Sequence, residues 1–120
     1  MDKIILKDMK FFGFHGVLDI EKERGQYFII DVEMCVDLTL PCSTDNIEDT
    51  VDYSKVFNMV RDITEKEKYN LIERLAQVIS EKILQDFICV KKVIVRVRKP
   101  DAPLDGDFGW SEVEIERFHE

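Results

Sequence analysis

The sequence has few of the residues that build disulfide frameworks or metal sites. Its three cysteines, Cys35, Cys42 and Cys89, are odd in number and lack a Cys-x-x-Cys spacing, which argues against both a disulfide framework and a thiolate zinc site. The two histidines, His15 and His119, give no metal-ligand pattern either. We therefore expect reduced cysteines in a cytoplasmic protein, and no metal.

Long apolar runs and an excess of positive charge are also missing. The first ten residues alternate between charged and apolar types, so we expect neither a signal peptide nor a membrane span. The net charge of −8 argues against a nucleic-acid partner, because nucleic acids select basic surfaces. A length of 120 residues suffices for one hydrophobic core, so we expect a single domain over residues 1–120.

Four segments alternate between apolar and polar residues with the period of a half-buried strand. The clearest runs from Gln26 to Thr39, where Phe28 and every second residue up to Leu38 fall on one face. Arg96 and Arg98 of the third strand could pair across the sheet with glutamates of the fourth. The four predicted strands lie at Ile4–Phe11, Gln26–Thr39, Val93–Arg98 and Glu112–Glu116.

The middle of the chain has apolar residues at helical spacing, from Val56 to Ile63 and from Ile72 to Ile83. Asp52 is expected to cap the first helix and Asn70 the second. The predicted fold class is therefore α+β, with ββααββ order, an antiparallel sheet and both helices on one face. The other face should be apolar and partly covered by another subunit. Its apolar residues would be Ile5, Met9, Tyr27, Ile29 and Cys35.

Two loops are longer than an antiparallel sheet needs. The connection between the first two strands has about three times the residues of a tight turn, with glycines at positions 13, 16 and 25. The segment Lys99–Gly109, between the last two strands, is eleven residues long. Long loops on a compact domain are usually functional, so we expect them to build a pocket.

The first of these loops contains two candidate polar groups, Glu21 and His15. Both are able to hydrogen-bond a polar ligand. The simpler interpretation of Glu21 is a solvated acid in an acidic run. His15, between glycines, is more often a turn or packing residue than a catalyst.

Three further residues allow a structural and a functional interpretation. Tyr53 is either an interfacial aromatic at a helix start or a phenolic proton donor. Glu73 either closes a capping box with Asn70 or binds two adjacent N–H donors of a heterocycle. Lys99 is either a solvated charge at a strand end or a positioned cation that carries a proton.

Five separated blocks together carry a family resemblance, which extends in register from about Ile4 to Glu116. In their order and spacing they resemble the dihydroneopterin aldolases of folate biosynthesis. Ile72 departs from the family pattern, in which leucine is frequent at this position. A ligand contact made through the backbone should tolerate this change of side chain. The blocks are Gly13-Phe14-His15-Gly16-Val17 with Glu21 and Gly25-Gln26, Thr44-Asp45-Asn46, Thr50-Val51-Asp52-Tyr53, Asn70-Leu71-Ile72-Glu73-Arg74-Leu75-Ala76, and Lys99-Pro100-Asp101-Ala102-Pro103.

This resemblance implies a tunnelling fold, in which subunits join their sheets edge to edge into a barrel with active sites between neighbours. Family members commonly stack two tetrameric rings into an octamer. By position, Glu73 resembles the carboxylate that anchors the pterin, and the backbone near Val51 and Ile72 would help to hold the ring. Lys99, Tyr53 and Glu21 would be the catalytic groups near the side chain that is cleaved.

The implied reaction converts 7,8-dihydroneopterin into 6-hydroxymethyl-7,8-dihydropterin and glycolaldehyde. The C=N bond of the dihydropterin accepts the electron pair that the cleavage releases, so neither a lysine Schiff base nor a metal ion is needed. We therefore expect no cofactor. Readdition of glycolaldehyde on the opposite face would give a second, epimerase activity.

Two alternatives remain open from the sequence. A dihydroneopterin triphosphate epimerase is the nearest relative in function, although a triphosphate would call for more cationic residues near the site. The chain could also be a catalytically silent pterin-binding or oligomerisation module, which a test of turnover separates.

Overall fold

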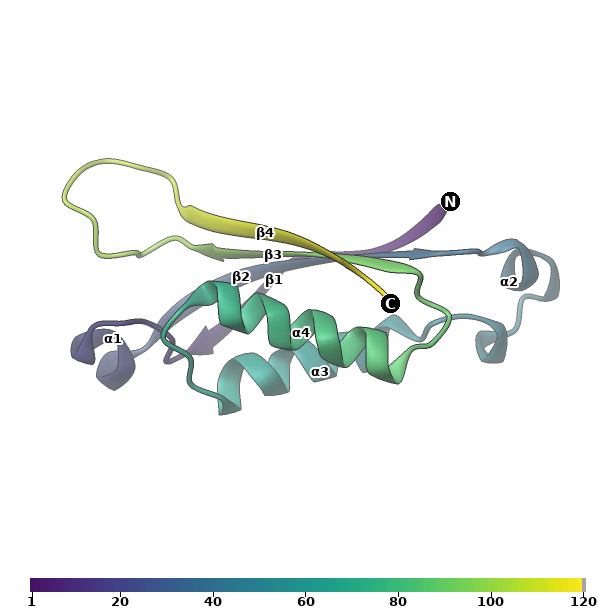
Figure 1. The fold of residues 1–120 in the computed structure, drawn as a ribbon, viewed down its shortest axis with the longest axis horizontal. Coiled ribbons are helices and arrows are strands. Elements are labelled where there is room, and N and C mark those ends of the chain that lie inside the picture. The colour runs from purple at the N-terminus through teal and green to yellow at the C-terminus, as the bar shows by residue number, and fades with distance from the viewer. Residues whose placement is uncertain (120) are drawn as a thin grey trace.

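A computed structural model describes residues 1–119 of the chain. A four-stranded sheet forms one layer, and the two long helices form a second layer against one of its faces (Figure 1). In chain order the elements are β1 (Asp2–Gly13), α1 (Asp19–Arg24), β2 (Gln26–Val36), α2 (Thr39–Thr44), the short 3₁₀ helix η1 (Ile47–Asp49), α3 (Tyr53–Lys66), α4 (Ile72–Asp86), β3 (Lys92–Lys99) and β4 (Ser111–Phe118).

The sheet has the order β1-β2-β3-β4, and each neighbouring pair is antiparallel. Alternate residues of β2 from Phe28 to Val36 are buried and face α3 and α4, as the sequence pattern predicts. From the helices, Val60, Leu75 and Ile79 are fully buried against them. The predicted α+β class, ββααββ order and placement of both long helices on one face are confirmed.

The starts of the two long helices differ. Asp52 caps α3 as predicted, because its carboxylate accepts the backbone N–H of Ser54 at 3.0 Å. The predicted cap of α4 by Asn70 is wrong. Leu71 occupies the N-cap position with extended backbone (φ −121°, ψ 139°), which leaves Asn70 one residue outside the helix and removes the capping box expected with Glu73.

Two short helices occupy segments predicted to be loop or strand. Helix α1 lies inside the first long loop, with acidic residues in its first turn and basic residues in its last. Strand β2 ends at Val36 rather than at the predicted Thr39, and helix α2 begins at Thr39, where the carboxylate of Asp37 accepts the backbone N–H of Thr39 at 3.0 Å in a local turn that competes with the strand. None of the helices in residues 1–119 is long and apolar enough to cross a membrane.

The face of the sheet opposite the helices is only partly apolar, which corrects the prediction. Ile5 and Tyr27 are exposed there, but Cys35 is buried. Met9 lies in the core on the helical side. The register shifts between Leu6 and Met9, so the alternation of β1 reverses at this bulge and Met9 changes face.

Ion pairs cross the centre of this face. Arg98 forms two hydrogen bonds of 2.8 Å to the buried carboxylate of Asp31 and a third, of 2.7 Å, to Asp8 at the bulge. Arg96 contacts both Glu33 and Glu114. Arg98 also lies 3.7 Å from the carboxylate of Glu112, so the predicted pairing of both arginines with glutamates of β4 is confirmed, and β2 supplies further acidic partners.

His15 ties the first long loop to the helical layer, which confirms its interpretation as a packing residue. Its side chain is fully buried. Nε2 donates to the carbonyl of Thr64 at 2.7 Å, and Nδ1 accepts the N–H of Tyr69 at 3.1 Å. Burial lowers the pKa of His15 below its ordinary value, and this outweighs the Thr64 hydrogen bond, which favours the charged form.

We predict that this histidine makes stability depend on pH. The unfolded chain binds a proton near pH 6.5, whereas folded His15 binds one only at lower pH, so the free energy of unfolding should fall as the pH drops below about 6.5. One such group contributes a slope of at most about 1.4 kcal/mol per pH unit. Urea unfolding at pH 7.5, 6.5 and 5.5, at fixed protein concentration, measures the slope. His15→Gln should reduce it, and the exposed control His119→Gln should not. An unchanged slope in His15→Gln would contradict the prediction.

Candidate active site

A cleft of about 440 Å³ opens where the start of α4, the end of β3 and the α1 loop meet. Four of the residues predicted from the sequence line it: Glu21, Ile72, Glu73 and Lys99. Leu18 and Pro103 provide apolar wall, so the cleft combines a few polar groups with apolar surface, as ligand sites commonly do.

Glu21 and Lys99 form an ion pair at the floor of this cleft. Glu21 lies on α1 and is 8% exposed, so it is not the solvated acid of the simpler interpretation. Its Oε2 accepts hydrogen bonds from Lys99 and from Gln26, the latter at 3.0 Å, and its Oε1 accepts the N–H of Leu18 at 3.3 Å. Burial alone would raise the pKa of the Glu21 carboxyl, but these hydrogen bonds outweigh burial and hold it below its usual value.

Gly16 allows the loop to pass close to this carboxylate. Its φ of 155° lies where other residues are strained, and a Cβ built there would come within 2.5 Å of Cδ of Glu21. Its N–H also donates to the carbonyl of Tyr69 at 3.0 Å, and Tyr69 is the residue whose own N–H donates to His15. The absence of a side chain at Gly16 therefore allows the loop backbone to pack directly against Glu21.

Lys99 is the last residue of β3, and the strand alternation turns it away from Arg98. Arg98 is held on the other face by Asp31, and Lys99 contacts Glu21 on its own side. Contacts on both faces thus fix the end of β3. Lys99 is largely enclosed, with 13% of its side chain exposed, so it is not a solvated edge charge.

The first turn of α4 presents donors and an acceptor to the cleft. Ile72 and Glu73 are its first two residues, and the N-cap Leu71 has no side-chain group to accept their N–H groups. Glu73 is exposed. A carboxylate beside free backbone N–H groups suits a planar ligand edge that carries both N–H donors and a carbonyl.

Val51 and Tyr53 lie at the other end of the molecule. They line a separate cleft, also of about 440 Å³, with residues of β1 and α2. Tyr53 begins α3, whose fourteen residues span roughly 21 Å toward the cleft that holds Lys99. Figure 1 shows α1 and α2 at opposite ends of the sheet. One chain therefore does not bring Tyr53, which is 60% exposed, to the Glu21–Lys99 pair.

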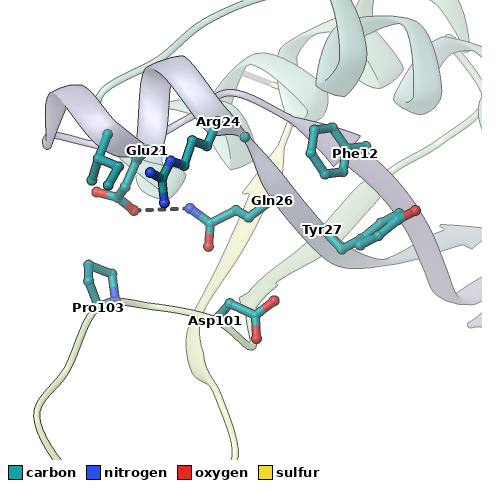
Figure 2. Close-up of a pocket in the computed structure, with 9 residues that line it drawn as sticks. Phe12, Glu21, Arg24, Gln26, Tyr27, Asp101 and Pro103 are labelled. Carbon is teal, nitrogen blue, oxygen red and sulfur yellow. Dashed lines mark hydrogen bonds between the residues drawn. The ribbon is translucent and has the colours of Figure 1, made fainter.

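Gln26 was not assigned a role from the sequence, although it contacts Glu21 directly. Figure 2 shows its amide beside the carboxylate of Glu21, at the wall of a neighbouring cleft that also includes Arg24 and Asp101. Its position immediately after Gly25, between α1 and β2, was the only local signal. Within residues 1–119, no three His, Cys, Asp or Glu side chains group as a metal site.

Comparison with known proteins identifies relatives over nearly the whole chain. The family model for dihydroneopterin aldolase matches residues 4–116. A dihydroneopterin aldolase of Streptococcus pyogenes serotype M18 is 39% identical over 117 residues, which cover 98% of each chain.

Two solved structures share the fold. The Escherichia coli dihydroneopterin aldolase in complex with neopterin is 26% identical, with a TM-score of 0.90 over 98% of this chain and 99% of that chain. A structure from Vibrio cholerae O1 biovar El Tor, described as a dihydroneopterin aldolase, is 29% identical, with a TM-score of 0.93 over 99% and 98% of the two chains. With the match over residues 4–116, these likenesses show that the chain belongs to the dihydroneopterin aldolase family.

Proposed function

We propose that the cleft between α1, β3 and α4 binds 7,8-dihydroneopterin and cleaves it to 6-hydroxymethyl-7,8-dihydropterin and glycolaldehyde, a lyase step of tetrahydrofolate biosynthesis. The observation that carries this proposal is the buried Glu21–Lys99 pair next to the uncapped first turn of α4. The first feature supplies proton-transfer groups and the second supplies a ring-binding edge. We place the reaction in the cytoplasm and in one domain, residues 1–120.

Recognition of the ring follows from the chemistry of the first turn of α4. A pterin has a 2-amino-4-oxo edge, with adjacent N–H donors and one carbonyl. The carboxylate of Glu73 accepts the donors, and a backbone N–H near Ile72 donates to the carbonyl. The E. coli relative was crystallised with neopterin, a ligand that has this edge.

The cleavage needs proton transfer and an acceptor for the released electron pair. When a side-chain hydroxyl loses its proton, the adjacent C–C bond breaks, glycolaldehyde leaves, and the electron pair moves into the protonated C=N bond of the ring. Lys99 and a water held by Glu21 move the hydroxyl proton, and Tyr53 assists when the remaining enol carbon is protonated. The substrate serves as its own electron sink, so the reaction proceeds without a Schiff base or a metal ion.

Tyr53 and Val51 reach this chemistry only from a second copy of the chain. The outer strands β1 and β4 each have an unpaired edge in the single chain, which favours edge-to-edge pairing of copies. Such pairing would bring the α3 start of one subunit to the α4 start of the next. We propose a ring of subunits with composite sites, assembled as an octamer of two tetrameric rings.

The basic test of this function is incubation of the purified protein with 7,8-dihydroneopterin in the presence of EDTA, with glycolaldehyde measured over time. We expect turnover at a rate that EDTA does not change. Binding without turnover would support the silent pterin-binding alternative. A rate restored only by added zinc would overturn the metal-free mechanism.

We predict that Glu73→Gln weakens pterin binding by roughly 1.5–3 kcal/mol, because the charge-assisted hydrogen bonds are lost. The melting temperature should barely change, since Glu73 is exposed and closes no capping box. Calorimetric titration measures the binding. Glu65→Gln, which removes the same charge from the surface of α3, is the matched control and should bind normally. Unchanged binding by Glu73→Gln would rule out the anchoring role.

We predict that Lys99→Ala and Tyr53→Phe each lower kcat by ~10²–10⁴-fold, the usual cost of losing a proton-transfer group. Both variants should still bind the pterin through Glu73. Steady-state kinetics and calorimetry separate the two effects. Lys82→Ala, which removes an ion-paired lysine from the surface of α4, should keep full activity. Borohydride treatment should trap no adduct, and a lysine adduct seen by mass spectrometry would contradict the mechanism.

A further inference from the structure

The side-chain amide of Gln26 has one satisfied end and one unsatisfied end. Its Nε2 donates to Oε2 of Glu21 at 3.0 Å. Its Oε1 is buried and has no hydrogen-bond partner among the described residues. In Figure 2 the nitrogen points to Glu21 and the carbonyl points away from it, toward the side of the cleft where Asp101 and Pro103 lie.

This arrangement is unfavourable for stability alone. A buried carbonyl without a donor loses its hydration and gains nothing in return, whereas an apolar side chain of similar size would avoid that cost. Rotating the amide by half a turn would place its carbonyl against the carboxylate of Glu21, where two acceptors repel each other. The contact with Glu21 therefore sets the orientation of the amide.

The hydrogen bond from Gln26 also affects the orientation of the Glu21 carboxylate relative to Lys99. Of the two carboxylate oxygens, Oε1 is held by the N–H of Leu18, and Oε2 is shared by Gln26 and Lys99. A carboxylate that is bound by the residue preceding α1 and by side chains of β2 and β3 has little freedom to rotate. Without the amide, Lys99 would be the only side chain within residues 1–119 that binds Oε2.

We infer that Gln26 is a positioning residue, which keeps Glu21 ionised and oriented toward Lys99 for the proton transfer. This inference rests on the proposed function, because it concerns the same cleft. Charged groups on the surrounding elements are Lys99 on β3, Arg24 on α1, Asp101 after β3 and Glu73 on α4. Gln26 carries no charge, and it contacts Glu21 directly through its amide nitrogen.

The test is the pH dependence of kcat/KM in a series at position 26. Activity needs ionised Glu21, so the rate should fall on the acid side as this carboxylate gains a proton. Gln26→Met keeps the length but removes the donor, and should shift the acid limb upward by about one pH unit. Gln26→Glu places a second carboxylate against Glu21 and should shift it further, through like-charge repulsion.

Gln77→Met is the matched control. Gln77 on α4 also donates its amide to a glutamate, Glu81, at 2.9 Å, outside the cleft. This variant should leave the acid limb in place. A limb that stays in place in both Gln26 variants would overturn the inference. So would a rate loss in Gln26→Met that is equal at all pH values, because that pattern indicates a packing defect.

A second measurement separates this inference from the proposed function. ¹³C NMR of protein labelled at the glutamate carboxyl carbons follows the titration of Glu21 without substrate, and Glu21→Gln assigns its signal. We expect its midpoint to rise in the order wild type, Gln26→Met, Gln26→Glu. If the wild type lacked aldolase activity but showed this order, the proposed function would fail and the positioning role would stand. The same midpoint in all three proteins would refute the positioning role, whatever the activity.

Discussion

The two long helices run in opposite directions along the sheet, and this constraint determines where the chain can do chemistry. The first turn of α3 carries Tyr53 at one end of the molecule, and the first turn of α4 carries Glu73 at the other. A helix of fourteen residues is longer than a pterin, so one ligand cannot touch both ends of the same chain. The free edges of β1 and β4 offer a way to join copies so that the two ends meet. We infer that assembly and activity are linked for this geometric reason.

At the end of the molecule where α1 and the start of α4 lie, the charged side chains are held in place without a ligand. Consecutive residues of β3 point to opposite faces, where Arg98 is bound by Asp31 and Lys99 by Glu21. Glu21 in turn is held by Gln26 and by the backbone of Leu18. Groups whose positions are already fixed need little reorganisation when charge moves, which is the main electrostatic advantage of an enzyme site over water.

The sequence predicted what depends on repeated patterns and missed what depends on single residues. The strands and long helices show several periods of alternation, so their class and order could be inferred. Helices α1 and α2 have six residues each, too few for a helical period to stand out. The bulge before Met9 reversed the facing of β1, and nothing in the local pattern marked it. Glu21, Glu73 and Lys99 were predicted through the family resemblance, whereas the contact of Gln26 with Glu21 needed three-dimensional geometry.

The most direct test of the composite site is to combine two inactive variants, Lys99→Ala and Tyr53→Phe. If each site takes Lys99 from one subunit and Tyr53 from its neighbour, random mixing in one assembly restores both residues in about a quarter of the sites. Co-refolding the two variants in equal amounts, followed by measurement of aldolase activity, should recover about that fraction of the wild-type rate. Activity no higher than that of the separate variants, in assemblies shown by mass spectrometry to be mixed, would contradict the account. It would mean that a single subunit supplies both residues.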